Sequence, residues 1–149
     1  MASNNIPTRY AHADGHTDIC YSEDGKYMIT CGSDGDARIW NGIEDDDPFS
    51  TVVGERAIAV AIKDDHFYIG NDNNHVQAYS LKGKSRDGII TRFTAPVTHI
   101  AVSKDGRTIV SGSDMSIHVT DKETLKDKIL NGHKAPILGV AIDPKEKYL

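Results

Sequence analysis

The sequence predicts an all-β fold made of repeated antiparallel strand units, and three observations support this prediction. Asp-Gly turns between alternating apolar runs occur at Asp24-Gly25 and again at Asp105-Gly106, and this pattern is the strongest short-range signal for a β-hairpin. The pattern returns about every forty residues, so that Trp40, Tyr79 and Thr120 stand 39 and 41 residues apart. The glycines lie where hairpins need a positive φ, not at the start of a helix.

The first copy of the unit extends from residue 19 to residue 40 and reads ICYSEDGKYMITCGSDGDARIW. It contains an apolar strand, the Asp-Gly turn, a second strand, a tight turn around Asp34 and a third strand that ends at Trp40. The third copy, residues 100–120, repeats the order of strands and turns of the first copy, and the second copy is degenerate but in phase. A fourth copy begins at Gly132-His133, because KAPILGVAID (134–143) repeats TAPVTHIAVS (94–103) almost position by position.

Four strands are expected in each of the first three copies, essentially without helix. The first copy is expected to have strands near 17–22, 27–31, 37–41 and 49–53. The strands of the second copy are expected near 57–62, 67–70, 76–80 and 89–94, and those of the third near 97–103, 107–111, 116–120 and 125–130.

A forty-residue unit of short strands, with Gly-His before the first strand and an aromatic residue closing the third, resembles the WD40 repeat, which forms one blade of a β-propeller. The resemblance implies blades over residues 15–53, 54–94 and 95–131, the start of a fourth blade over 132–149, and a closing strand of the last blade within 1–14. Since propellers close with about four to eight blades, we expect an incomplete ring, the N-terminal fragment of a longer protein.

The same resemblance implies a structural hydrogen-bond tetrad in the first blade. Its members are His12, Thr30, Asp34 and Trp40. The second copy has no matching His, and the third is expected to place Val110 and Thr120 where the hydroxyl and the indole belong, although it keeps Asp114. Blades two and three are therefore expected to be held mostly by apolar packing and strand ladders.

Charge is distributed unevenly along the chain. Residues 1–50 contain three basic and ten acidic side chains, a net charge of −7, whereas residues 51–149 contain fourteen and twelve, a net charge of +2. An acidic first blade disfavours binding to phosphate backbones.

Two charged segments are candidate contacts for partners, and each has two readings. The acidic run is interpreted either as a solvated loop between the third and fourth strands or as a docking patch for a basic segment. It comprises Glu44, Asp45, Asp46 and Asp47. The basic segment favours either an exposed lysine-rich loop or a contact with protein or DNA; it comprises Lys82, Lys84 and Arg86, with Arg92 nearby.

The two cysteines are expected to be reduced thiols in the core. A two-residue turn at Asp24-Gly25 pairs Cys20 with Ile29, which leaves Cys31 diagonal to Cys20 and too far away for an easy disulfide. No segment approaches the roughly 18 apolar residues of a membrane span, and the N-terminus lacks a hydrophobic signal core. We therefore expect a soluble, intracellular protein without membrane contact.

Enzymatic and metal-binding patterns are missing from the sequence. The seven histidines are scattered among loops and strands of different copies, which favours structural or exposed roles, and no CxxC pair is present. Neither a GxSxG elbow nor a phosphate-binding GxxxxGK[ST] loop is present, and paired carboxylates occupy turns, where Asp bonds to backbone amides. No catalytic, cofactor-binding or metal-binding residue is expected.

Four segments support a closer assignment. RYAHADGHTDIC (9–20), ITCGSDGDARIW (29–40) followed by DDDP (45–48), DGIITRFT (87–94) and GHKAPILGVAIDPKEKYL (132–149) together resemble the N-terminus of the WD-repeat and HMG-box DNA-binding protein family. These are replisome adaptors of the chromosome-transmission-fidelity type.

The resemblance implies a nuclear, non-enzymatic scaffold that couples the CMG helicase to DNA polymerase α-primase on chromatin, with roles in replication, cohesion and repair. Trimerisation through a second propeller and DNA binding through an HMG box are expected only in regions beyond Leu149. The alternative is a WD40 adaptor or substrate receptor in another nuclear complex, such as a ubiquitin ligase or an RNA-processing assembly. A propeller enzyme is a third, weaker alternative.

Overall fold

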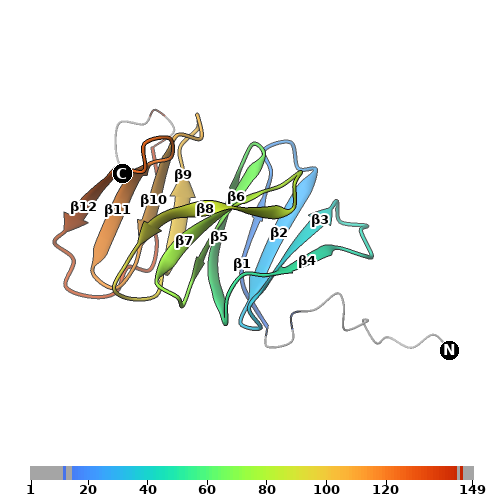
Figure 1. The fold of residues 1–149 in the computed structure, drawn as a ribbon, viewed down its shortest axis with the longest axis horizontal. Helices are drawn as coiled ribbons and strands as arrows, with labels where there is room; N and C mark the ends of the chain where they lie inside the picture. The colour runs from blue at the N-terminus through green and yellow to red at the C-terminus, as the bar shows by residue number, and fades with distance from the viewer. Residues whose placement is uncertain (1–11, 13–14, 144, 146–149) are drawn as a thin grey trace.

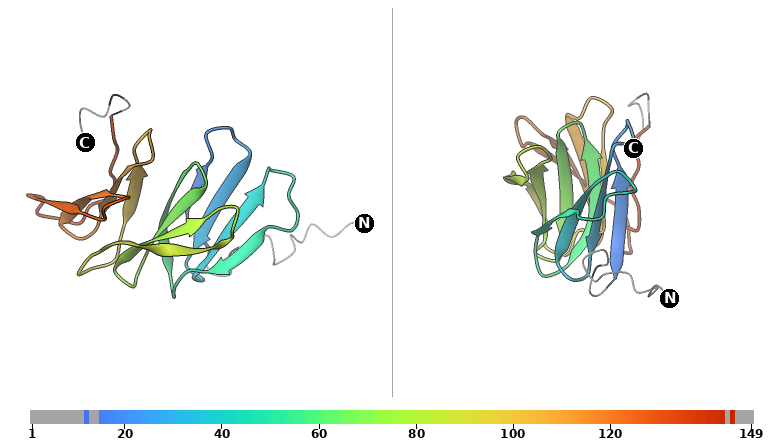
Figure 2. Two further views of the ribbon diagram at one scale, coloured as in Figure 1. Left: turned by 45° about the horizontal axis from the view of Figure 1, so that its top comes forward. Right: turned by 90° about the vertical axis from the view of Figure 1, so that its right-hand side faces the viewer.

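The fold is described by a computed structural model for residues 12, 15–143 and 145. In this part of the chain there are twelve strands and no helix, which confirms the all-β prediction. The strands form three four-stranded antiparallel sheets, each built from consecutive strands. The sheets stand side by side in chain order (Figure 1), and the same order is visible in the turned view on the left of Figure 2.

Each sheet corresponds to one copy of the repeat. The first contains β1 (His16–Tyr21), β2 (Tyr27–Gly32), β3 (Asp36–Asn41) and β4 (Phe49–Val52). The second contains β5 (Ala57–Lys63), β6 (His66–Asn71), β7 (His75–Ser80) and β8 (Ser85–Arg92). The third contains β9 (His99–Val102), β10 (Thr108–Gly112), β11 (Ser116–Asp121) and β12 (Asp127–Asn131).

All twelve strands overlap their predicted ranges. The largest difference is at β8, which begins at Ser85, four residues before the predicted start at residue 89. The pairing of β8 with β7 begins at Ser85, which lies opposite Ser80, and it contains two register shifts. Such bulges leave extra residues unpaired on one strand, so the alternation of apolar and polar residues that marks a strand in the sequence is broken.

The Asp-Gly turns of the first and third copies have the same geometry. Gly25 and Gly106 have φ values of +71° and +76°, a region that glycine adopts without strain. In each turn the Asp carboxylate accepts a hydrogen bond of 2.6 Å from the hydroxyl of the serine two residues earlier. The repeat therefore extends from the sequence to individual side-chain contacts.

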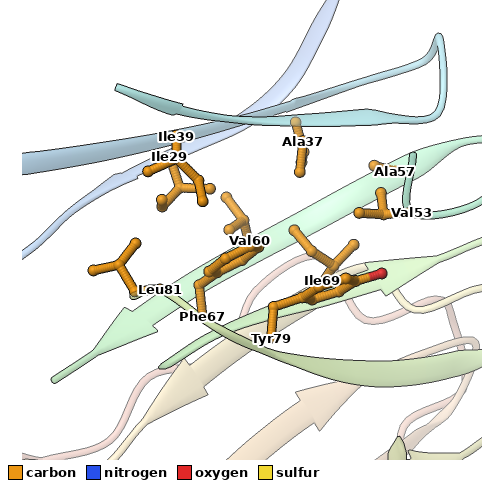
Figure 3. Packing of buried hydrophobic residues seen from close by; sticks show 11 residues of the cluster. Ile29, Ala37, Ile39, Val53, Ala57, Val60, Phe67, Ile69, Tyr79 and Leu81 are labelled. Carbon is orange, nitrogen blue, oxygen red and sulfur yellow. The ribbon is translucent and has the colours of Figure 1, made fainter. Parts of the chain in front are cut away.

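The hydrophobic core lies between the sheets. Side chains of the first and second sheets point toward one another in Figure 3 and form one cluster, which includes Ile29, Ile39, Val60, Phe67, Ile69, Tyr79 and Leu81. A second cluster lies between the second and third sheets and includes Tyr68, Val76, Ile90, Ile100 and Ile109. Neighbouring residues of β6 belong to different clusters because side chains alternate across a strand, so the middle sheet is buried on both faces.

Threonine side chains link consecutive units. The Thr17 hydroxyl donates to the carbonyl oxygen of Ala57 at 2.6 Å, and the Thr98 hydroxyl makes the equivalent bond to Ile137 at 2.5 Å. Ile137 is 4% exposed, and its amide donates to the carbonyl oxygens of Ser113 and Asp114. The chain after the third sheet is thus attached to that sheet.

Two predicted segments have no strand to report. Residues 132–143, expected to begin a fourth blade, contain no strand, because a strand needs a neighbour for its ladder and the described residues supply none. Apart from His12, the predicted closing strand within residues 1–14 lies outside the described residues.

The second and third sheets share a polar network that was not predicted, so apolar packing and strand ladders are not their only contacts. Thr91, His118 and Thr120 of this network are buried, whereas Asp127 is exposed. The Thr91 hydroxyl donates to Asp127 at 2.6 Å, and its oxygen accepts a hydrogen bond of 2.8 Å from Nδ1 of His118. Thr120 donates to the other carboxylate oxygen of Asp127. The His118 ring also stacks on Phe93, with 3.8 Å between the ring centroids.

This network predicts a pH-dependent stability. Burial lowers the pKa of His118 below its ordinary value of about 6.5, an effect that nearby Asp127 partly opposes. The unfolded chain then binds a proton more readily than the folded chain, so the stability from neutral His118 is complete above about pH 6.5 and is lost as the pH falls. Urea unfolding at pH 7.5 and pH 5.5 measures the loss.

The variant His118→Asn is the control, because its amide can replace the Nδ1 hydrogen bond without titrating. We expect the loss of unfolding free energy between the two pH values to be smaller in this variant than in the wild type. An equal loss in both proteins would contradict the role of His118.

Candidate interaction surface

Two searches of the described residues for specialised sites have a negative outcome. No group of three or more His, Cys, Asp or Glu side chains within residues 12, 15–143 and 145 has a geometry that could hold a metal ion. Over the same residues, no helix is long and apolar enough to span a bilayer. The residues left to place are the four of the tetrad and those of the two charged segments.

The four tetrad residues lie together in the first sheet. Nδ1 of His12 is 2.9 Å from Oδ1 of Asp34, and Nε2 of the same ring is 2.9 Å from the Thr30 hydroxyl. The indole nitrogen of Trp40 donates to the Thr30 hydroxyl at 3.0 Å. His12 is 5% exposed and Thr30 is 2% exposed, so the loss of any one partner would leave buried polar atoms without a hydrogen bond.

The third sheet has a hydroxyl at the position of Thr30, but it is Ser111 and not Val110. Thr30 pairs with Ile19 and Arg38, and Ser111 pairs with the corresponding residues of β9 and β11. The prediction of Val110 was therefore wrong by one residue. The turn between β10 and β11 is one residue shorter than the turn between β2 and β3, since Gly112 pairs with Ile117 whereas Cys31 pairs with Ala37. Counting back from Asp114 at the spacing of the first copy therefore ends one residue before the hydroxyl.

Ser111 lacks the partners that Thr30 has. Ser111 is fully buried, and its hydroxyl oxygen has no hydrogen-bond partner among the described residues. Thr120 occupies the position of the indole in this sheet, and its hydroxyl is bonded to Asp127 instead. In the second sheet the same position holds Tyr79, which stacks on Phe67 with 5.0 Å between the ring centroids.

The acidic run lies in the loop between β3 and β4, and Asp45 organises this loop. Its carboxylate accepts the backbone amides of Asn41 at 2.8 Å and Asp47 at 2.9 Å. These two bonds, together with the charge of Lys84, lower the pKa of Asp45. Asp45 is half-buried, whereas the other three acidic side chains of the run, Glu44, Asp46 and Asp47, are exposed.

The structure divides the predicted basic segment. Lys82 and Lys84 lie in the turn between β7 and β8, at the same end of the sheets as the acidic loop. Arg92 ends β8 and pairs with His75, at the opposite end of the sheet. At about 3.3 Å per residue it is roughly 20–25 Å from Lys84, so it does not join the lysine cluster. Arg86, which is also exposed, lies on β8 between them.

The acidic loop and the lysine turn both line one groove. The groove has a volume of about 690 Å³ and lies where the first and second sheets meet. Its lining includes Asp45 and Asp47 of the acidic loop, Lys82 and Lys84 of the lysine turn, and apolar side chains.

Sequence reasoning missed the apolar floor of this groove. Tyr27, Phe49 and Leu81 belong to it, and they come from three different strands or turns of two sheets. A weak signal was present, because Phe49 follows the acidic run within two residues and Leu81 directly precedes Lys82. Only the packing of one sheet against the next shows that the two loops meet.

Both cysteines are free thiols, with Cys20 half-buried and Cys31 buried. Cys20 pairs with Ile29 across the hairpin, which is the register that the turn predicted. Burial raises the pKa of Cys20 to about 12 and that of Cys31 to about 11. Both thiols are therefore protonated and poorly reactive at neutral pH.

Comparison with known families assigns the repeat. Residues 9–149 match the family model described as the WDHD1 first WD40 domain. The chain belongs to this family. The match confirms the WD40 resemblance and covers all three sheets, so each four-stranded sheet is one WD40 blade.

Relatives of the WDHD1 family include proteins from animals and a yeast. The chain is 43% identical to WD repeat and HMG-box DNA-binding protein 1 of Xenopus laevis over 143 residues, 95% of its length. It is 38% identical to the Homo sapiens protein of the same name over 151 aligned positions, which include the whole chain. Minichromosome loss protein 1 of Schizosaccharomyces pombe is 31% identical over 115 residues, 76% of the chain. The alignments span only 13% to 14% of the relatives' own lengths.

The tetrad predicts unequal effects of removing the aromatic residue from the first two WD40 blades. Trp40→Ala removes a buried ring and leaves the hydroxyl of Thr30 with one partner fewer, so we expect a loss of about 3–5 kcal/mol of unfolding free energy. Tyr79→Ala should cost less, because among the described residues no tetrad like that of the first blade depends on Tyr79. Equal losses in urea unfolding would show that the tetrad adds nothing beyond burial.

A second pair of variants tests the two equivalent hydroxyls. Ser111→Ala removes an unsatisfied buried hydroxyl, and we expect it to raise the unfolding free energy by about 0.5–1 kcal/mol. Thr30→Val, which also replaces a buried hydroxyl by an apolar group, removes the hydroxyl that contacts Nε2 of His12 and Nε1 of Trp40 and should cost about 1–3 kcal/mol. Urea unfolding measures the two changes in unfolding free energy, which we expect to have opposite signs. A loss of unfolding free energy in both variants would contradict the strand register that places Ser111 at the position of Thr30.

Proposed function

We propose that this WD40 domain is a protein-interaction module of a non-enzymatic scaffold in the DNA replication machinery. In this proposal the whole protein couples the replicative CMG helicase to DNA polymerase α-primase on chromatin. The observation that carries it is the family match over residues 9–149, together with identities of 38% to 43% to WD repeat and HMG-box DNA-binding proteins.

The chemistry of the domain supports binding rather than catalysis. The largest aromatic and aliphatic side chains are committed to the packing between blades, and buried polar side chains such as Thr30 and Thr91 are held in side-chain hydrogen bonds. Exposed charge is concentrated in the turns at one end of the blades, where a partner would meet loops carried on a rigid scaffold. Propellers serve as platforms in many assemblies, so the family supplies the replication context and the fold does not.

The names of the relatives support a nuclear location and a chromosomal role. The animal relatives are named for an HMG box and DNA binding, and the Schizosaccharomyces pombe relative for minichromosome loss. We propose that this chain acts in the nucleus, and that contact with DNA and trimerisation depend on other regions of the whole protein. The charge of the domain supports this division, because residues 1–50 carry a net charge of −7.

The proposal predicts weak DNA binding by this domain alone. We expect its affinity for duplex DNA to be no tighter than nonspecific binding, with a Kd of about 10⁻⁴ to 10⁻⁶ M and strong salt dependence. Fluorescence anisotropy with a labelled duplex at several salt concentrations measures it. A submicromolar, salt-resistant affinity that disappears when Lys82, Lys84 and Arg86 are neutralised would place DNA binding in the propeller and contradict the proposal.

The protein arm of the test uses the full-length protein as bait in extract from replicating nuclei. We expect mass spectrometry to identify subunits of DNA polymerase α-primase and of the replicative helicase among the captured proteins. Capture of a ubiquitin-ligase or RNA-processing complex in their place would favour a different nuclear role.

A further inference from the structure

Two adjoining hollows form one continuous groove between the first and second blades. The larger hollow is the groove of about 690 Å³ between the acidic loop and the lysine turn. The smaller one, of about 330 Å³, lies beside the turns that follow β1 and β5. Tyr27, Leu81 and Lys82 line both hollows, so the two are in direct contact along these side chains.

The floor of this inter-blade groove is apolar. Ile39 and Leu81 are 5% and 6% exposed, and Tyr27 and Phe49 are half-buried. These side chains come from both blades, so the floor exists only where the blades pack. An apolar side chain of a partner that enters the groove would lose its contact with water on a preformed surface.

The walls of the groove are predominantly acidic. Two lysines line the hollows, Lys82 and Lys84. Six carboxylates line them: Glu23, Asp24, Asp45, Asp47, Asp64 and Asp65. Two of the carboxylates belong to the larger hollow and four to the smaller one, and the two hollows share the apolar side chains of Tyr27 and Leu81. This distribution is complementary to an occupant with positive charge on both sides of an apolar group.

Lysines of the chain itself already lie on the aromatic residues of the floor. The ammonium group of Lys84 is 4.9 Å from the ring centroid of Phe49, and that of Lys26 is 5.2 Å from the ring centroid of Tyr27. An aromatic face near carboxylates attracts cations, and arginine more strongly than lysine. Both lysines are exposed and long, so a partner's cation can displace them at little cost.

We infer that the inter-blade groove binds an extended segment of a partner protein in which one large apolar side chain is flanked on both sides by Lys or Arg. The apolar side chain lies over Tyr27 and Leu81, and the flanking cations meet the carboxylates at the two ends of the groove. One cation takes the place of Lys84 over Phe49. The inference rests on the proposed function as a protein-interaction module and specifies the chemistry of one partner.

The first experiment varies the peptide and leaves the protein unchanged. The probe is a fluorescein-labelled twelve-residue peptide with Arg-Arg-Leu-Lys-Arg at its centre and Gly-Ser flanks, titrated with the full-length protein at about 150 mM salt. We expect replacement of the Leu by Ser to weaken binding about tenfold or more. A peptide with Glu at the four basic positions should not bind. Equal binding of the three peptides would overturn the inference, whether or not any variant of the protein folds.

The second experiment changes the groove, with a matched control for each charge change. Asp47→Lys should weaken binding of the Arg-Arg-Leu-Lys-Arg peptide about five- to tenfold, whereas Asp114→Lys, the same change on an exposed turn of the third blade, should alter it less than about twofold. Phe49→Leu keeps an apolar floor but removes the ring face, and it should weaken binding about threefold.

Lys84→Ala provides a test of opposite sign. This variant removes the side chain that competes for the Phe49 ring, so we expect the affinity to rise two- to fivefold. Lys128→Ala makes the same charge change on exposed β12 of the third blade and should leave the affinity unchanged. Equal effects of a groove variant and its control would show that net charge alone governs binding and would overturn the inference.

Failure of this inference is distinguishable from failure of the proposed function. If the peptide does not bind while the full-length protein still captures replication proteins from nuclear extract, the groove inference is wrong and the proposed function stands. If the peptide binds with the expected order of variants while the captured proteins belong to another process, the groove inference stands and the proposed function is wrong. Loss of captured proteins in Asp47→Lys, but not in Asp114→Lys, supports both.

Discussion

Packing of each blade against the next is the interaction on which the rest of this structure depends. A four-stranded sheet of this size cannot bury two faces by itself, and here the middle blade buries both because it lies between two others. The alternation of side chains along β6 sends Phe67 and Ile69 to one cluster and Tyr68 to the other. The hydroxyls of Thr17 and Thr98 also donate hydrogen bonds to the next unit along the chain, so each unit is bonded to the one that follows it.

The polar interior varies from blade to blade, although the strand framework does not. In the first blade a histidine, a hydroxyl, a carboxylate and an indole satisfy one another. The third blade keeps the buried hydroxyl as Ser111, but this hydroxyl has no partner among the described residues. The carboxylate contact of the third blade is made by Asp127, which accepts hydrogen bonds from Thr120 and from Thr91 of the second blade. One polar arrangement thus stabilises a single blade, and the other ties two blades together.

The groove between the first two blades is a consequence of the same packing. Blades fill the space between their strands with apolar side chains, but the turns at the blade ends diverge and carry charge, so a hollow with an apolar floor and acidic walls remains. Lys26 and Lys84 lie over the aromatic rings of its floor and show what kind of group the surface attracts. The floor of the groove is the edge of the core. A binding surface of this kind therefore needs no apolar side chains beyond those that the fold already requires.

The sequence by itself predicted the strands and the hairpin turns, because these depend on local periodicity and on the φ preferences of Asp-Gly turns. Its motifs resemble those of the WD40 family, and that resemblance implied the tetrad of the first blade. It also marked the acidic loop and the lysine turn as candidates. The tertiary structure decided what depends on register and on contact between blades. It put Ser111 rather than Val110 at the hydroxyl position, separated Arg92 from the lysines, and joined the two charged loops across one groove. A shift of one residue reverses the face of a strand, and residues about forty positions apart meet only after the blades pack. Local sequence patterns therefore do not reveal these three outcomes.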